Sequence, residues 1–116
     1  MSLQTEIDMA TLEELQATTD AEFVAEIVDA CCEDTPRYIA ELRESLTKQD
    51  LDTFRRAAHS IKSSSKIVGA LNLASQAAEL EQMARAGTLE DAATKTESLA
   101  ASYESVQHAL KGVAHG

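Results

Sequence analysis

His59 is the residue whose type and surroundings point most directly to chemistry. A neutral imidazole is a nucleophile near neutral pH, because the unperturbed pKa of a histidine side chain is about 6.5. His59 directly follows Ala58, which belongs to an apolar stripe, so the imidazole should lie about 100° around the helix from the buried face. An exposed histidine is ordinarily only a polar surface residue. The residues around His59 therefore decide between these two interpretations.

Basic residues gather around His59 although the chain is acidic. The formal net charge is −10, yet residues 51–70 hold four basic residues and one acidic residue. Helical spacing places Lys62 one turn after His59, on the same face. A phosphorylated histidine needs neighbouring cations to offset its added charge, so we predict that Lys62 stabilises a phosphoryl group on His59. The other basic residues and a small serine form a candidate docking surface for a partner protein. These docking candidates are Arg55, Arg56, Ser63 and Lys66.

Glu81 is expected to lie beside His59 because of the geometry of a helical hairpin. If the turn is centred near Ala70, His59 precedes it by 11 residues and Glu81 follows it by 11. At about 1.5 Å rise per residue, both residues lie roughly 16 Å from the turn. Glu81 also falls at the edge of an apolar stripe, where it would face the neighbouring helix. It could then accept a hydrogen bond from one ring nitrogen and leave the other free to attack phosphorus. The alternative is an ordinary solvated glutamate.

The composition indicates that helices position these residues. The sequence has one proline and four glycines, and its residues are 44% hydrophobic but only 3% aromatic. Few helix breakers and many small or unbranched apolar residues favour closely packed helices over sheets.

Periodicity and capping signals locate the first helices. Thr11 and Thr19 each stand three residues before a glutamate, a capping-box pattern that should start a helix. A second helix should run from about Asp20 to Lys48. Its expected buried positions are Phe23, Ile27, Cys31, Ile39, Leu42 and Leu46. Pro36 cannot donate to the Cys32 carbonyl, so we expect one bent helix there, with a restart capped by Thr35 as the alternative.

Three further helices follow in the sequence. Asp50 should cap a helix whose buried positions are Leu51, Phe54, Ala58, Ile61, Ser65 and Val68. Gly69 then offers a turn, and the next helix should end near Gly87. Its buried positions are Leu73, Ala77, Leu80 and Ala84. Thr88 should cap the last helix. The expected buried positions of that helix are Leu89, Ala92, Thr96, Leu99, Tyr103, Val106, Leu110 and Val113.

The predicted fold class is all-α, an antiparallel four-helix bundle with a short additional N-terminal helix around Leu12 and Leu15. The length favours a single domain over residues 1–116, with residues 1–8 as a flexible N-terminal segment. A closed bundle needs no second copy to cover its core, so we expect a monomer.

Several other kinds of function are disfavoured. The acidic charge argues against binding nucleic acid or an anionic membrane, and the sequence holds no membrane-spanning run or signal segment, so we expect a cytoplasmic protein. The adjacent Cys31 and Cys32 lack the spacing of a redox or metal motif and should be buried structural residues. The three histidines lack ligand spacing, which disfavours a metal site. No phosphate-binding loop is present, so we do not expect an enzyme in its own right.

These features occur together in one known protein family. His59-Ser60-Ile61-Lys62-Ser63-Ser64-Ser65, followed by Gly69-Ala70 and Leu80-Glu81, resembles the histidine-containing phosphotransfer (HPt) domain of bacterial two-component phosphorelays. The resemblance implies that His59 is the phosphoryl acceptor, Lys62 assists the phosphate and Glu81 orients the ring. This sequence has Ser63 where the family usually has glycine to admit the partner.

The resemblance also implies a partner and a reaction. His59 would exchange a phosphoryl group with the aspartate of a response-regulator receiver domain, or receive one from a histidine kinase. The receiver would supply Mg²⁺, and this chain would hold no cofactor of its own. The rival interpretation is a non-catalytic helical adaptor whose basic face docks on an acidic partner.

Overall fold

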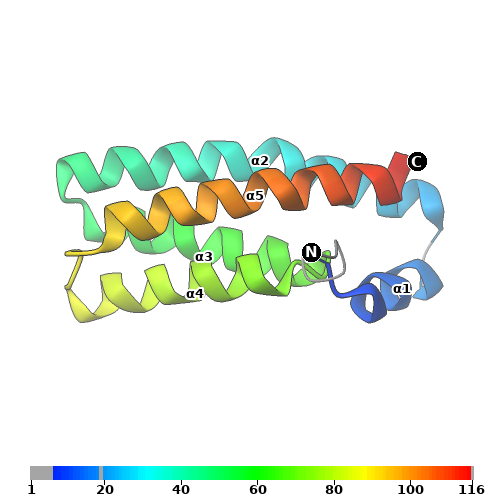
Figure 1. Cartoon of the computed structure of the whole chain (residues 1–116), viewed down its shortest axis with the longest axis horizontal. Helices are drawn as coiled ribbons and strands as arrows, with labels where there is room; N and C mark the ends of the chain where they lie inside the picture. The colour runs from blue at the N-terminus through cyan, green and yellow to red at the C-terminus, as the bar shows by residue number, and fades with distance from the viewer. Residues whose placement is uncertain (1–6, 19, 116) are drawn as a thin grey trace.

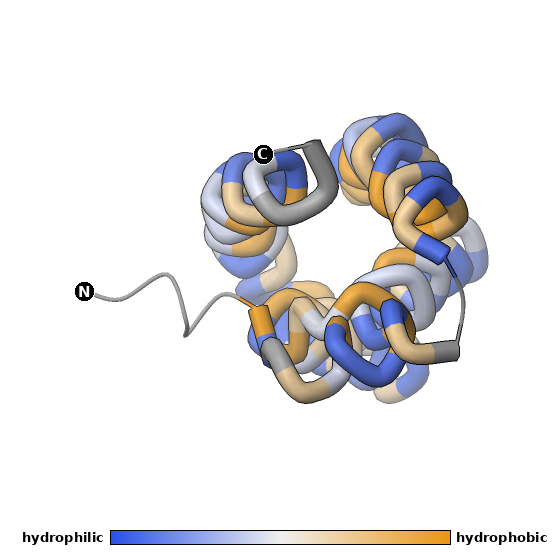
Figure 2. Tube along the Cα trace, turned by 90° about the vertical axis from the view of Figure 1, so that its right-hand side faces the viewer, coloured by the Kyte–Doolittle hydropathy of each residue, from blue (hydrophilic) through white to orange (hydrophobic). Residues whose placement is uncertain are grey.

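The chain folds into four long helices and one short one. The computed structural model describes residues 7–18 and 20–115, in the order α1 (Met9–Thr18), α2 (Ala21–Lys48), α3 (Leu51–Ile67), α4 (Leu71–Ala86) and α5 (Ala92–His115). The four long helices run side by side, and α1 lies at one end of them (Figure 1). Seen along the bundle, the long helices surround a common axis (Figure 2). The predicted all-α four-helix bundle with a short N-terminal helix is confirmed.

Side-chain caps and left-handed residues set the ends of the central helices. Asp20 accepts a hydrogen bond from the Phe23 N–H at 2.7 Å and caps α2. Asp50 accepts one from the Thr53 N–H at 3.2 Å and caps α3, as predicted. Gly87 ends α4 in the left-handed conformation with φ of 75°, which glycine adopts without steric cost. Between α3 and α4, the Gly69 N–H bonds to the Lys66 carbonyl and the Ala70 N–H to the Ser65 carbonyl, which forms the tight turn of an antiparallel hairpin.

Two of the predicted caps are wrong. Thr11 lies inside α1, because Asp8 accepts hydrogen bonds from the Thr11 N–H and hydroxyl and takes the capping position instead. Thr88 closes α4, since its N–H bonds to the Met83 carbonyl, and α5 begins only at Ala92. Thr19 and residues 1–6 lie outside the described residues. Ile7 is buried and the Asp8 N–H bonds to the Gly69 carbonyl, so the predicted loose segment does not extend to these two residues.

Helix α2 continues through Pro36 as a single helix, so the alternative of a restart capped by Thr35 is wrong. A proline removes the hydrogen bond to the carbonyl four residues earlier, here that of Cys32. The Tyr103 hydroxyl of α5 donates to this carbonyl at 3.0 Å and satisfies it. Burial raises the pKa of Tyr103, which keeps the phenol protonated as a donor. A contact between α2 and α5 therefore compensates for the proline.

The core consists mostly of aliphatic side chains and alanines from all the helices. The expected stripes of α3, α4 and α5 are buried except for Leu51, which is 39% exposed, and Leu89, which is half-buried; the side chain of Val113 lies outside the described residues. In α2 the prediction was wrong for Phe23, which is 48% exposed, because Val24 and Val28 face the core instead. The predicted buried positions Ile27 and Leu46 are only half-buried. Cys31 and Cys32 are buried free thiols, as predicted, and burial raises the pKa of both.

Gly69 fixes the start of α1 against the turn between α3 and α4. Its φ is +80°, and a Cβ built on it would lie 2.7 Å from the Asp8 carbonyl oxygen. We expect Gly69→Ala to lower the free energy of unfolding by roughly 2–4 kcal/mol in urea titrations, because left-handed strain and a backbone clash add together. Gly87→Ala is the matched control: its φ is +75° but its Cβ would meet nothing within 4 Å. It should cost only about 1 kcal/mol. Equal losses in the two variants would contradict the proposed clash.

Candidate functional site

The imidazole of His59 projects from the surface of α3. Its side chain is 54% exposed, whereas the preceding Ala58 is fully buried. The periodicity of α3 accounts for both, since Phe54, Ala58 and Ile61 form the buried stripe and His59 follows it by one residue. The ring is thus held on a rigid helix and remains accessible to a second protein.

Glu81 of α4 contacts the ring of His59. His59 Nδ1 lies 2.9 Å from Glu81 Oε2, across the α3–α4 hairpin. The tight turn at Gly69 and Ala70 brings the two residues level, as the hairpin geometry predicts. The solvated alternative for Glu81 is wrong, because its side chain is only 4% exposed.

Two cations share the buried carboxylate with His59. Lys62 Nζ lies 2.7 Å from Glu81 Oε1, and an Arg85 guanidinium nitrogen lies 3.2 Å from Glu81 Oε2. The sequence reasoning missed Arg85. Its position four residues after Glu81 on one helix was the available signal, since such pairs lie on the same face. Two positive charges therefore compensate one buried negative charge beside the imidazole.

These contacts determine the state of the Glu81 carboxylate. Burial acts to raise its pKa, but the hydrogen bonds from Lys62 and His59 outweigh burial and lower the pKa to about 2. Glu81 is thus ionised near neutral pH and can only accept hydrogen bonds. A neutral His59 in contact with it must then donate through Nδ1–H, which leaves the lone pair of Nε2 free.

The proposed docking residues lie on both sides of His59, and the two that precede it form ion pairs. Arg55 and Arg56 each bind Asp52, at 3.0 Å and 2.8 Å, so that one acidic residue offsets part of their charge. Ser63 and Lys66 are exposed on the part of α3 that follows His59. Asp52 therefore offsets part of the positive charge that the sequence assigned to the side of Arg55 and Arg56.

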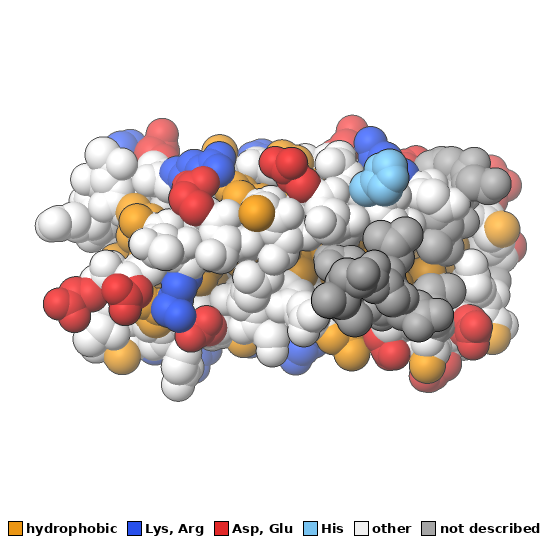
Figure 3. Space-filling view, viewed as in Figure 1, with side chains coloured by type: hydrophobic (Ala, Val, Ile, Leu, Met, Phe, Trp, Pro, Cys, Tyr) orange, Lys and Arg blue, Asp and Glu red, His pale blue; other side chains and the backbone are white. Residues whose placement is uncertain are grey.

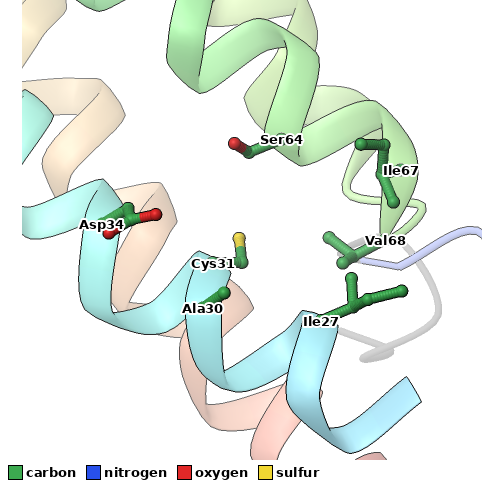
Figure 4. A pocket seen from close by; sticks show the side chains of 7 residues that line it. All are labelled: Ile27, Ala30, Cys31, Asp34, Ser64, Ile67 and Val68. Carbon is green, nitrogen blue, oxygen red and sulfur yellow. The ribbon is translucent and has the colours of Figure 1, made fainter. Parts of the chain in front are cut away.

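A shallow hollow lies between α2 and α3, close to Ser63 and Lys66 in sequence. It is lined by Ile27, Ala30, Cys31, Asp34, Ser64, Ile67 and Val68 (Figure 4). Its volume of ≈ 180 Å³ is below the roughly 300–1,000 Å³ of most small-molecule sites, so it suits a protruding side chain better than a free ligand. Ile67, which is 53% exposed, forms part of its rim.

On the face shown in Figure 3, acidic and basic side chains are interspersed without a continuous apolar patch. Among residues 7–18 and 20–115, no three His, Cys, Asp or Glu side chains are arranged to hold a metal ion. Within the same ranges, no helix is long and apolar enough to span a membrane.

Comparison with known proteins identifies the family. The model of the Hpt domain family matches residues 26–109, which is most of the chain and includes His59, Lys62, Glu81 and Arg85. The chain belongs to the Hpt domain family. A solved structure, histidine-containing phosphotransfer protein B (HptB) from Pseudomonas aeruginosa PAO1, is 28% identical, with a TM-score of 0.88 over 94% of each chain. No curated protein matches the chain significantly.

Membership of the Hpt family gives this chain a histidine-phosphotransfer role in phosphorelays. Hpt domains are phosphocarriers rather than enzymes of the usual kind, and they interact with histidine kinases and receiver domains. The predicted family is therefore confirmed.

Proposed function

We propose that Nε2 of His59 accepts a phosphoryl group and exchanges it with the aspartate of a receiver domain. The observation that carries this proposal is the contact of His59 Nδ1 with the ionised Glu81 at 2.9 Å on a ring that is 54% exposed. This arrangement fixes the tautomer that has its nucleophilic lone pair on Nε2, the nitrogen that does not face Glu81.

The transfer step follows from this tautomer. The Nε2 lone pair forms the N–P bond, and the P–O bond of the receiver's aspartyl phosphate breaks, its electron pair returning to the aspartate carboxylate. The Nδ1 proton stays on the ring, which gains a positive charge, and Glu81 stabilises that charge at 2.9 Å. Reversal of the same step returns the phosphoryl group to a receiver, so the direction depends on which partner is phosphorylated.

Lys62 is proposed to bind the phosphoryl oxygens during transfer. It stands one turn after His59 on α3, and its ammonium already lies at the site, 2.7 Å from Glu81 Oε1. The partner receiver is proposed to supply the Mg²⁺, so this chain would need no cofactor. The contribution of the Hpt chain to the rate is then to hold nucleophile and cation in place.

The partner is proposed to dock over the exposed part of α3 that follows His59. Ser63 and Lys66 would form the polar part of this surface, with the hollow beside Ile67 taking an apolar side chain, while Arg55 and Arg56 would contact the rim. One domain over residues 1–116, acting as a monomer, suffices for this function. A non-catalytic adaptor remains the second candidate, because the same exposed cations could bind an acidic partner without any transfer.

Phosphotransfer profiling distinguishes the two candidates. The purified chain would be incubated with radiolabelled, phosphorylated receivers and kinases from the source genome. A carrier should gain label from at least one partner within seconds to minutes, and the label should be acid-labile and base-stable, as expected of phosphohistidine. Binding to a partner without any transfer of label would favour the adaptor.

Docking to an acidic receiver pocket should weaken with salt. Raising the ionic strength from about 0.1 M to about 1 M shortens the Debye length from about 10 Å to about 3 Å and screens exposed charges such as Lys66. We expect kcat/KM for transfer to fall over this range, while the rate at saturating receiver changes little. Lys66→Ala should show a shallower salt dependence. A kcat/KM indifferent to salt in the unsubstituted chain would contradict charge-assisted docking.

A further inference from the structure

Arg85 binds the same carboxylate oxygen as the phosphorylatable ring. Its guanidinium lies 3.2 Å from Glu81 Oε2, and His59 Nδ1 lies 2.9 Å from that oxygen. Lys62 holds the other oxygen, Oε1, at 2.7 Å. The proposed transfer uses His59, Lys62 and Glu81 but gives Arg85 no part, although Arg85 completes the coordination of the buried carboxylate.

The two cations differ in what they can reach. Lys62 lies three residues after His59 on α3 and carries its charge on a flexible stem, so its ammonium can bind either Glu81 or a phosphoryl group on the ring. Arg85 lies one turn after Glu81 on α4, and its side chain is 58% exposed. Arg85 thus lies on the same helix as Glu81, whereas Lys62 lies on the same helix as His59.

A move of Lys62 to the phosphoryl group would leave Glu81 partly unpaired. The Glu81 side chain is 4% exposed, and a buried carboxylate oxygen without a donor costs free energy. In the described part of the chain, Arg85 is then the cation that still contacts Glu81. Its guanidinium is always charged and can donate two parallel hydrogen bonds to one carboxylate.

We propose that Arg85 is a positioning residue of the phosphotransfer site, which holds Glu81 against His59 Nδ1 while Lys62 moves from Glu81 to the phosphoryl group. This inference rests on the proposed function for its biological meaning. The inference requires that Arg85 keeps Glu81 in contact with His59 when Lys62 no longer binds Glu81. This requirement can be tested in the unphosphorylated chain.

The test uses Lys62→Ala to imitate the departure of the lysine. The ¹⁵N shifts of the His59 ring would be recorded about two pH units above the unperturbed histidine pKa of about 6.5, where an ordinary imidazole is neutral. We expect the Lys62→Ala chain to keep the Nδ1–H tautomer, because Arg85 still holds Glu81. The Lys62→Ala/Arg85→Ala chain should shift toward the Nε2–H tautomer. Lys62→Ala/Arg85→Lys should recover most of the Nδ1–H form, since the charge is restored.

A rate measurement provides the second readout. Phosphoramidate, a small phosphoryl donor that needs no docking surface, should phosphorylate Arg85→Ala roughly tenfold more slowly than the unsubstituted chain, which corresponds to about 1.4 kcal/mol. Arg43→Ala is the matched control, because Arg43 is also exposed and ion-paired, to Glu97 at 2.7 Å on the α2–α5 side. It should leave both the tautomer and the rate unchanged. Circular dichroism would check that each variant is folded.

The inference is overturned if removing Arg85 from the Lys62→Ala chain leaves the His59 tautomer unchanged, or if Arg85→Ala reacts with phosphoramidate as fast as the unsubstituted chain. A chain that shows the expected tautomers but accepts no phosphoryl group from any receiver or kinase would contradict the proposed function and leave the role of Arg85 intact. Failure of the Arg85 inference and failure of the proposed function therefore give different experimental results.

Discussion

His59→Gln should abolish phosphoryl labelling of the chain by a cognate donor. Glutamine has no nitrogen lone pair that can attack phosphorus, so the loss should be complete rather than partial. The histidine side chain is 54% exposed, and its replacement leaves the buried stripe of α3 unchanged. The variant should therefore unfold at nearly the same urea concentration. Gel autoradiography after incubation with a labelled donor measures the result.

His108→Gln is the matched control for this variant. His108 is also exposed on a helix, but it lies on α5, whereas Lys62 and Glu81 lie on α3 and α4. It should take up label as fast as the unsubstituted chain. Labelling of His59→Gln at the normal rate would show that another residue accepts the phosphoryl group, and the assignment of His59 would then be wrong.

Glu81→Ala should slow phosphorylation of His59 by roughly 10- to 100-fold. The charge-assisted hydrogen bond it removes is worth about 1.5–3 kcal/mol, and each 1.36 kcal/mol corresponds to a tenfold change in rate. Without the carboxylate, Nδ1–H loses its acceptor, and the positive charge that develops on the ring loses its stabilising partner. The ¹⁵N shifts of the ring should move toward the Nε2–H tautomer. Single-turnover transfer from a phosphorylated receiver measures the rate.

Two further variants separate the hydrogen bond from the charge. Glu81→Gln keeps an oxygen that can accept from Nδ1–H but removes the negative charge, so its rate should lie between those of Glu81→Ala and the unsubstituted chain. Glu79→Ala removes an exposed carboxylate from the same helix, one that pairs with Lys95 at 3.0 Å, and should change neither the rate nor the tautomer. If Glu81→Ala keeps the normal tautomer and rate, Glu81 has no role in orienting the ring.

Helix periodicity placed the central parts of the site correctly. Ala58 and Ile61 define the buried stripe of α3, and the position of His59 one residue beyond Ala58 makes it exposed. Counting residues on either side of the turn was enough to set Glu81 level with His59, because helix rise is nearly constant. The ion pairs of Arg55 and Arg56 with Asp52 could also have been predicted from the sequence, since the spacings are three and four residues.

The exposure of residues at the helix ends depended on the tertiary structure. Phe23 and Leu51 fit the apolar pattern, but each stands in the first turn of its helix and is left partly open to solvent. Periodicity gives the direction in which a side chain points, not whether another helix covers that turn. Likewise, the carbonyl freed by Pro36 is satisfied by Tyr103, 71 residues after Cys32 in the chain, a contact that requires the packing of α5 against α2.

The residues that share a face with His59, and the residue that opposes it, can be predicted from sequence because both follow from local helix geometry and one short turn. The burial of Glu81 and its contacts with both Lys62 and Arg85 became evident from the packed helices and not from the sequence. Burial depends on the side chains that surround a residue from several helices, and the ionised state of Glu81 depends on the balance between that burial and its donors. Hairpin geometry predicts the contact between His59 and Glu81, whereas the burial and the ionised state of Glu81 come from tertiary packing.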